Sequence, residues 1–187
     1  MKTSVIQFLI PCIFFLYACN KCEETTESPS NVDQSDIPIL FPYNGKEKIK
    51  FLRNSTDTII FYNLGINTTY NYTNTQADCT VKIPLEQKNM QFIDSVYGNN
   101  IQLINYVNSA DNDQFAIVVN NVIIVEKPAI NFIAKQPPIK SITILGKQYD
   151  SISTWNNIFK DSVTYKTLRF GVLRFTSNKN IFELIPQ

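Results

Sequence analysis

Short apolar runs separated by turn residues repeat along most of this chain, and this pattern constrains the fold more than any other feature. The runs are rich in Ile, Val, Phe, Tyr and Thr, whose side chains fit a pleated sheet. In 115–125, two such runs flank Asn120-Asn121, and asparagine tolerates the positive φ of a two-residue turn. Gly146-Lys147 separates another two runs, with glycine placed as in a type II′ turn. We expect a further turn at 98–100.

Successive hairpins pair antiparallel, so the sequence predicts an all-β fold. The expected architecture is an antiparallel meander of hairpins that forms a sandwich or an open barrel. The short segment 154–160 is the one helix candidate. Pro128 and Pro137-Pro138 are expected at strand ends or edges, because proline cannot donate a hydrogen bond to a sheet. No repeat is visible, and we expect a single all-β domain over 37–187.

The first 18 residues have the pattern of a signal peptide. Lys2 precedes Val5–Ala18, a mostly apolar run of 14 residues that is too short to span a bilayer. The run ends in Leu16-Tyr17-Ala18-Cys19, which resembles the bacterial lipobox. This resemblance implies that Cys19 carries the lipid and becomes the mature N-terminus, with the membrane as partner. Tyr17 departs from the pattern, because that position is usually small or β-branched. The alternative is a soluble secreted protein cleaved after Ala18.

Residues 19–36 are predicted to form an acidic, flexible tether. They carry five acidic residues against Lys21 and almost no apolar side chains, so they cannot bury enough surface to order themselves. Glu23 and Glu24, close to Cys19, also resemble the surface-export signal of Bacteroidota lipoproteins. The same acidic residues also fit a solvated tether. The expected location is therefore the cell envelope, as an outer-membrane lipoprotein that faces either the cell surface or the periplasm.

Three further segments resemble small Bacteroidota secreted lipoproteins of unknown function. They are Leu40-Phe41-Pro42-Tyr43 leading into 48–51, the segment 144–152, and 168–175 followed by 182–185. The resemblance covers the lipobox and about the last fifty residues. Phe182 stands where tryptophan is commoner, and the paired tyrosines usual before Gly171 are missing. Because that family has no assigned activity, the resemblance implies location and all-β architecture only.

Two kinds of modification are open beyond the lipid. Cys22 and Cys79 form an even pair in an oxidising envelope, and they either form a disulfide or remain two free thiols. Four hydroxyl residues follow an aspartate and precede an apolar residue, a pattern that resembles Bacteroidota O-glycosylation sites. These are Thr58, Ser95, Ser151 and Ser162. Boundaries between turns and strands produce the same short pattern by chance.

The sequence offers no catalytic set, and we expect no enzyme, cofactor or metal. It has no histidine, and its five glycines are too scattered for a phosphate-binding loop. Its formal net charge of +1 argues against nucleic acid. Asp111 and Asp113 form an oxygen-rich cluster, but it lacks the glycine and distal glutamate of a calcium loop and is predicted to be a polar hairpin tip.

Two functions remain. The first is a non-catalytic, lipid-anchored lipoprotein that binds or scaffolds a protein or glycan. The alternative is a carrier that encloses an apolar, lipid-like ligand in a curved sheet. The apolar hairpin 115–125 fits either reading, as a buried central hairpin or as a pocket wall. A filled core favours the first function and a lined cavity favours the second.

Overall fold

The computed structural model describes residues 25–74, 81–130, 141–150, 152–157, 161–166 and 170–186. Its elements are β1 (Thr25–Thr26), α2 (Ile37–Leu40), β2 (Lys48–Arg53), β3 (Asp57–Asn74), β4 (Val81–Asp94), β5 (Asn100–Val107), β6 (Asp113–Val119), β7 (Val122–Pro128), β8 (Ile142–Ile144), β9 (Lys147–Tyr149), β10 (Ser153–Asn156), β11 (Ser162–Lys166), β12 (Gly171–Ser177) and β13 (Asn180–Leu184). The all-β prediction is confirmed.

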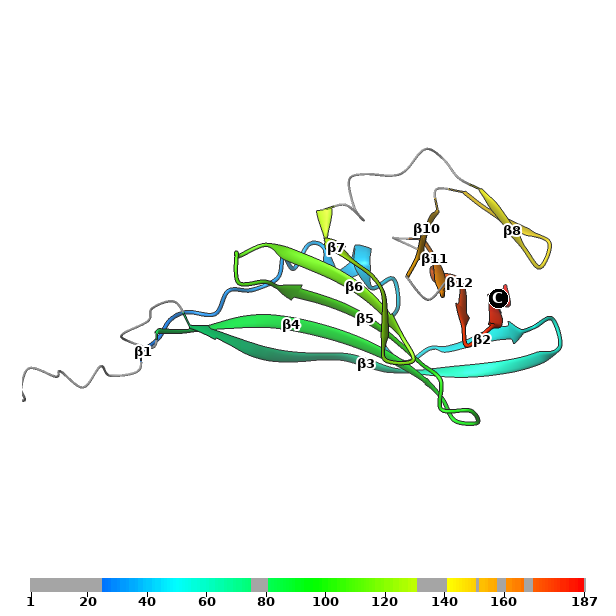
Figure 1. Ribbon diagram of the computed structural model, residues 1–187, viewed down its shortest axis with the longest axis horizontal. Helices are drawn as coiled ribbons and strands as arrows, with labels where there is room; N and C mark the ends of the chain where they lie inside the picture. Colours follow the sequence, from blue (N-terminus) through cyan, green and yellow to red (C-terminus); the bar gives the residue numbers. More distant parts are fainter. Residues whose placement is uncertain are drawn as a thin grey trace, which may run out of the picture.

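One large antiparallel sheet forms the body of the molecule. Its strand order is β10-β11-β12-β13-β2-β3-β4-β5-β6-β7, so two meanders meet where β13 pairs with β2. The end strands β7 and β10 contact each other, and the sheet curls into a nearly closed barrel (Figure 1). Of the two predicted architectures, the structure therefore has the barrel. The β8–β9 hairpin forms a separate small sheet beside it.

Aromatic side chains fill the interior of this barrel. Among the described residues, the side chains of Phe51, Phe61, Phe92, Phe115, Phe175 and Phe182 are less than 2% exposed. The rings of Phe175 and Phe182 stack with centroids 4.3 Å apart, and Phe51 meets Phe61 edge-on at 5.4 Å. Edge and offset contacts of this kind add to the free energy gained from burial. The interior is a packed core.

The short helix α2 belongs to the same core, although no periodic pattern of apolar residues indicates it. Leu40 and Phe41 are buried, and the Phe41 ring meets the Phe115 ring at 5.9 Å. The Tyr165 hydroxyl donates a hydrogen bond to the carbonyl of Leu40. Four residues are too few to show a helical repeat, which is why the pattern of apolar residues did not reveal this element.

Residues 25–36, which the sequence analysis assigned to the tether, lie against β4. Thr25–Thr26 pairs in parallel with Val81 and Lys82, and Ser30 both donates to the carbonyl of Pro84 and accepts from the amide of Glu86, at 2.9 Å each. Val32 is only 2% exposed. The backbone groups on this side of β4 lie beyond its pairing with β5, which explains why a polar segment docks there.

The turns show one agreement and one correction. Asn120 and Asn121 have φ values of 50° and 64°, as a type I′ turn requires, so this prediction is confirmed. The next hairpin turns at Leu145-Gly146, with φ values of 48° and 81°, because Ile144 pairs with Lys147. The prediction of Gly146-Lys147 was therefore wrong by one residue. Glycine occupies the second central position, and leucine takes the first.

Three other local predictions have mixed outcomes. The β4–β5 connection contains turn residues 95–97 and continues through Gly98, slightly before the expected position. The helix candidate 154–160 was wrong in its first part, because Ser153–Asn156 is strand β10, held by pairing with β11. Pro128 is the last residue of β7, at a strand end as expected. Pro137-Pro138 lies outside the described residues.

We predict that Leu145→Asn stabilises the protein. A leucine with positive φ is strained, whereas asparagine adopts this conformation more readily, and the Leu145 side chain is 43% exposed. The free energy of unfolding, measured by urea titration, should rise by roughly 0.5–1 kcal/mol. Gln148→Asn, an exposed control in the extended part of the same hairpin, should give no gain. A loss for Leu145→Asn would contradict the assigned turn.

Candidate binding site at the barrel mouth

The structure describes three of the seven residues that the sequence singled out. Cys19, Cys22, Cys79 and Ser151 lie outside the described residues. Thr58 is exposed at the start of β3, and Ser95 is exposed in the turn after β4. Ser162 is half-buried in β11, and its hydroxyl lies 3.1 Å from that of Thr176.

Thr58 and Ser95, far apart in sequence, line the same surface depression. It has a volume of about 450 Å³ and is also lined by Tyr62, Val96 and Tyr97. The guanidinium of Arg53 lies 4.0 Å from the centre of the Tyr97 ring. The exposed hydroxyls of Thr58 and Ser95 meet the steric requirement for modification. The hydroxyl of Ser162 is already engaged with Thr176.

The aspartate that precedes Ser95 has a structural role. The Asp94 carboxylate accepts hydrogen bonds from the amides of Val96, Tyr97 and Asn99, at 2.6–2.9 Å. Burial acts to raise the pKa of Asp94, but these donors together outweigh it and lower the pKa. The charged carboxylate therefore holds the β4–β5 turn, which is a sufficient reason for an aspartate at this position.

The acidic hairpin tip between β5 and β6 also serves the fold. Asp111 accepts a hydrogen bond from the Ser30 hydroxyl, and Asp113 accepts one from the amide of Asp33 at 2.8 Å. Both contacts attach the segment 30–33 to the barrel. Among the described residues, no group of three or more His, Cys, Asp or Glu is arranged to hold a metal ion. No helix in that part of the chain is long and apolar enough to cross a membrane.

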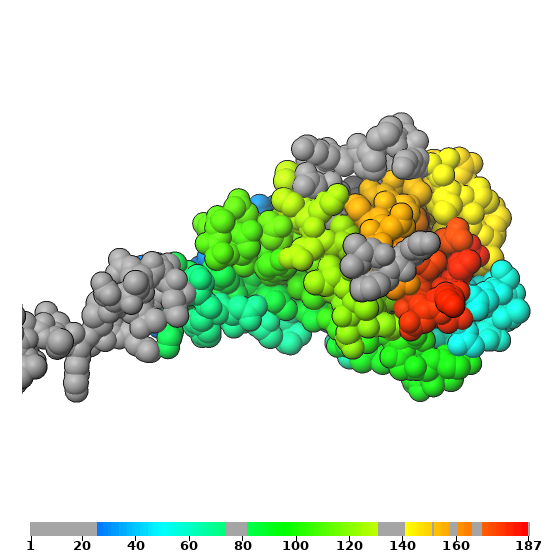
Figure 2. Space-filling view, in the orientation of Figure 1, coloured from blue at the N-terminus to red at the C-terminus, as the bar shows by residue number. Residues whose placement is uncertain are grey.

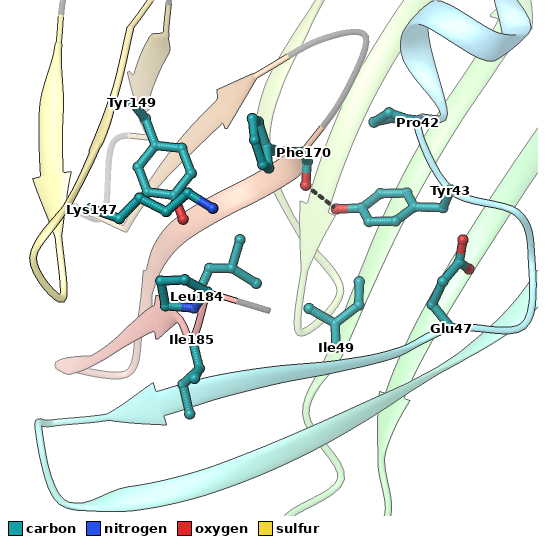
Figure 3. Close-up of a pocket in the computed structure, with 10 residues that line it drawn as sticks. Pro42, Tyr43, Glu47, Ile49, Lys147, Tyr149, Phe170, Leu184 and Ile185 are labelled. Atoms are coloured by element: carbon teal, nitrogen blue, oxygen red, sulfur yellow. Dashed lines mark hydrogen bonds between the residues drawn. The ribbon is translucent and has the colours of Figure 1, made fainter.

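A pocket of about 260 Å³ opens at one mouth of the barrel (Figure 3). The connection from α2 to β2, the β8–β9 hairpin, the residue before β12 and the end of β13 all contribute to it. Its walls are Pro42, Tyr43, Glu47, Ile49, Lys147, Tyr149, Phe170, Leu184, Ile185 and Pro186. The pocket thus assembles from segments that are widely separated in the sequence.

Tyr43 is fixed at this pocket by the backbone that follows Phe170. Its hydroxyl donates to the carbonyl of Phe170 at 3.2 Å and accepts from the amide of Val172 at 2.8 Å. A Cβ atom on Gly171 would lie 1.9 Å from the Tyr43 hydroxyl oxygen, and the φ of Gly171 is +66°. Glycine is therefore required at position 171, both for its conformation and for the space that Tyr43 occupies.

A cation and two aromatic rings form the opposite wall. The Tyr149 and Phe170 rings meet edge-on with centroids 5.2 Å apart. The Lys147 ammonium lies 5.6 Å from the centre of the Tyr149 ring and 5.3 Å from that of Phe170. Attraction between the ammonium and the ring faces holds Lys147 at the pocket. This wall therefore presents a positive charge on an aromatic surface.

The Tyr149 hydroxyl is a pocket donor whose hydrogen bond is not made within the described part of the chain. Tyr149 is 2% exposed, and its buried hydroxyl has no hydrogen-bond partner among the described residues. In Figure 3 the hydroxyl end of the ring is directed toward Leu184. Burial raises the pKa of Tyr149, so the group keeps its proton at neutral pH and acts as a donor. A buried donor without a partner costs free energy, and an acceptor in the pocket would remove that cost.

Glu47 has its hydrogen-bonding capacity used by its own loop. The carboxylate accepts from the amides of Gly45 and Lys46 at 3.0 and 3.1 Å, from the amide of Asn44, and from the Asn63 side chain at 2.9 Å. Burial acts to raise the pKa of Glu47, but the donors prevail and lower it. Glu47 thus remains an anion that shapes the pocket rim rather than a proton donor.

Sequence reasoning did not find this pocket. Gly146 and Lys147 were singled out as a turn, and Tyr43, Tyr149 and Gly171 were noticed only as parts of a family resemblance. The signal that could have pointed to Gly171 is a glycine directly before an apolar strand. Its tyrosine partner lies more than 120 residues earlier, beyond any local pattern.

We predict opposite effects for two conservative tyrosine substitutions. Tyr149→Phe removes a buried hydroxyl without a partner, so the free energy of unfolding should stay unchanged or rise by up to ~1 kcal/mol. Tyr165→Phe removes the donor to the Leu40 carbonyl and should cost ~1 kcal/mol. Urea titration of both variants checks this. Equal losses would mean that the Tyr149 hydroxyl already has a partner.

Comparison of this chain with protein-family models, with curated proteins and with solved structures finds no match. No known ligand or activity can therefore be transferred to the mouth pocket. Its chemistry is defined by its own polar and aromatic groups, namely the rings of Tyr43, Tyr149 and Phe170, the Lys147 ammonium and the Glu47 carboxylate.

Proposed function

We propose that this protein is a lipid-anchored outer-membrane lipoprotein whose β domain is a non-catalytic binding module. The anchor is supported by the apolar run Val5–Ala18 and the lipobox-like Leu16-Tyr17-Ala18-Cys19. Orientation toward the cell surface is supported by Glu23 and Glu24 beside the anchor. An anchor of more than one acyl chain, as the lipobox resemblance implies, gives stable attachment.

The observation that carries the binding role is the unpaired Tyr149 hydroxyl beside Lys147 in the mouth pocket. A ligand that fits has a flat apolar part, which contacts Tyr149, Phe170 and Leu184, and an anionic oxygen, which accepts from the hydroxyl and the ammonium. The volume of about 260 Å³ lies just below the range of drug-sized sites and suits a molecule with a single ring.

The filled interior favours this binding module over a lipid carrier. Phe51, Phe61, Phe92 and their neighbours occupy the space in which a carrier would hold an acyl chain. The mouth pocket is also lined by charged and hydroxyl groups, for which a hydrocarbon offers no partner. A small anionic ligand would pair with the Lys147 ammonium and the Tyr149 hydroxyl, while the Glu47 carboxylate already accepts hydrogen bonds from its own loop and from Asn63.

We predict that Cys19→Ser abolishes lipid attachment. Wild-type protein should incorporate radiolabelled palmitate, stay with the membrane through a high-salt wash and dissolve in detergent. Cys19→Ser should incorporate none and leave the membrane fraction. Cys22→Ser, three residues along, should label like wild type. Equal labelling of Cys19→Ser and wild type would contradict the assigned anchor.

We predict that benzoate binds at the mouth pocket and that benzyl alcohol, which has the ring without the charge, binds at least ~10-fold more weakly. Benzoate should raise the melting temperature of the detergent-purified protein in a dose-dependent manner, because it binds the folded state. Lys147→Met and Tyr149→Phe should each reduce this shift, whereas Lys179→Met, an exposed control in the β12–β13 turn, should not. If both Lys147→Met and Tyr149→Phe keep the full rise in melting temperature, benzoate binds elsewhere. If millimolar benzoate does not raise the melting temperature of wild type, this ligand class is wrong.

A further inference from the structure

Strand β3 continues well beyond the barrel. It pairs with β2 only as far as Tyr62, and the amide of Asn63 then bonds the carbonyl of Glu47 at 3.0 Å. A Cβ atom on Gly45 would lie 3.4 Å from the Cα of Gly65, so the two backbones run close together here. From Ile66 to Asn74, β3 pairs with β4 on one side, and no described residue pairs with it on the other. This part of β3 and β4 runs away from the C-terminal strands as a long ribbon (Figure 1) and lies at the elongated end of the molecule in the space-filling view (Figure 2).

The register shows which backbone groups of β3 face the open side. On β4, the carbonyls of Lys82 and Pro84 and the amide of Glu86 bond residues 27–30, away from β3. Residues directly opposite one another in an antiparallel pair either exchange hydrogen bonds or both face away. Asn74, Tyr72 and Tyr70 lie opposite these residues and must face away from β4. Successive residues of a strand direct their N–H and C=O groups to opposite sides, so Thr68 and Ile66 also face away from β4. The even-numbered residues 66–74 therefore present N–H and C=O groups to the open edge.

Pro84 agrees with this assignment. Proline has no N–H and is normally excluded from the middle of a sheet. At a position that faces away from β3, its nitrogen is not needed for the β3–β4 ladder, and its carbonyl accepts from Ser30. The strand therefore tolerates proline inside a long hairpin.

The open edge of β3 lacks the features that normally prevent pairing with another chain. Residues 66–74 contain no charged residue, no proline and no glycine. Ile66, Tyr70 and Tyr72 are 43%, 44% and 63% exposed. The other edges of the large sheet in the described part are protected. Residues 25–30 cover β4, β7 ends in Glu126-Lys127-Pro128 beside β10, and β10 has only four residues.

We propose that the edge Ile66–Asn74 pairs antiparallel with the same edge of a second copy of this chain. The register is centred on Tyr70, which lies opposite Tyr70 of the second copy. Thr68 then lies opposite Tyr72, and Ile66 lies opposite Asn74. All these positions face the open side, so each facing pair exchanges two backbone hydrogen bonds. The continuous sheet closes as a symmetric dimer.

Self-complementarity is the reason for choosing a second copy over a foreign strand. In this register no charged side chains meet, and Tyr70 and Thr68 form aromatic–aromatic and threonine–aromatic cross-strand pairs, which are favourable. On the other face Thr69 lies opposite Asn71, and Asn67 lies opposite Thr73. The paired stretch also ends before Gly65, where Gly45 and its loop cover the edge.

The first test is the mass of the full-length, detergent-solubilised protein by light scattering, at roughly 1 to 100 μM. Wild type should be a dimer. Tyr70→Pro should dimerise at least ~10-fold more weakly, because it removes an N–H group that faces the open edge. Its far-UV circular dichroism should match that of wild type, because the hydrogen bonds between β3 and β4 remain. Ile123→Lys on edge strand β7, where Ile123 is 52% exposed, is the matched control and should stay dimeric.

The second test reads the register directly in a Cys22→Ser, Cys79→Ser background. Tyr70→Cys places two thiols on residues with Cα atoms ~5.5 Å apart, within disulfide reach, and mild oxidation should give a covalent dimer. Thr69→Cys places them diagonally at ~7–8 Å, and should give little. Equal cross-linking of both variants would overturn the register, and this result stands even if Tyr70→Pro fails to fold. A monomeric wild type, with or without a co-purified foreign peptide, would overturn the dimer.

Discussion

The phenylalanine rings inside the barrel set how far the closed part of the sheet extends. Phe61, Phe92 and Phe175 lie within one buried cluster, and the inward face of β4 changes chemistry just beyond Met90. The next inward residues on β4 are Lys88 and Glu86, whose side chains form an ion pair at 2.8 Å. Such residues cannot fill an apolar barrel, so the sheet opens there. Strand β5 accompanies β4 as far as Gln87, and β3 and β4 continue beyond it as a ribbon. The segment 30–33 covers the Glu86 side of this ribbon through hydrogen bonds from its backbone.

Since aromatic side chains fill the interior, the mouth and the ribbon are two places where groups suited to binding lie outside the core. At the mouth, Tyr43 and Gly171 hold the rim in one conformation, because the tyrosine occupies the space that any side chain at 171 would need. Across from them, Lys147 and Tyr149 present a charge and a donor that the fold itself does not use for packing. On the ribbon, the backbone groups of β3 are similarly unused. Both surfaces combine rigid support with unsatisfied polar groups, as binding sites require.

Local patterns predicted local structure well and long-range assembly poorly. Asn120-Asn121 identified its turn because asparagine tolerates positive φ, whereas Leu145 concealed the next turn because leucine rarely adopts that conformation. Composition alone placed residues 25–36 in a tether, yet the open backbone of β4 orders them. The mouth pocket could not be predicted, because Tyr43 and Lys147 are brought together only by barrel closure. The pattern of an aspartate, a hydroxyl residue and an apolar residue does coincide with exposed positions at Thr58 and Ser95. At Ser95 the preceding Asp94 accepts hydrogen bonds from the turn, which by itself explains the aspartate.

The central claim is that the open edge of β3, beyond the filled barrel, binds a second copy of the chain. Amide hydrogen exchange along β3 tests this claim most directly. Asn67, Thr69 and Asn71 face β4, and their amides should exchange slowly at every protein concentration. Ile66, Thr68 and Tyr72 face the open side, and protection of their amides should increase as the concentration rises, because a second copy covers them. Fast exchange of these three amides at all concentrations would contradict the account, as would slow exchange that does not change on dilution.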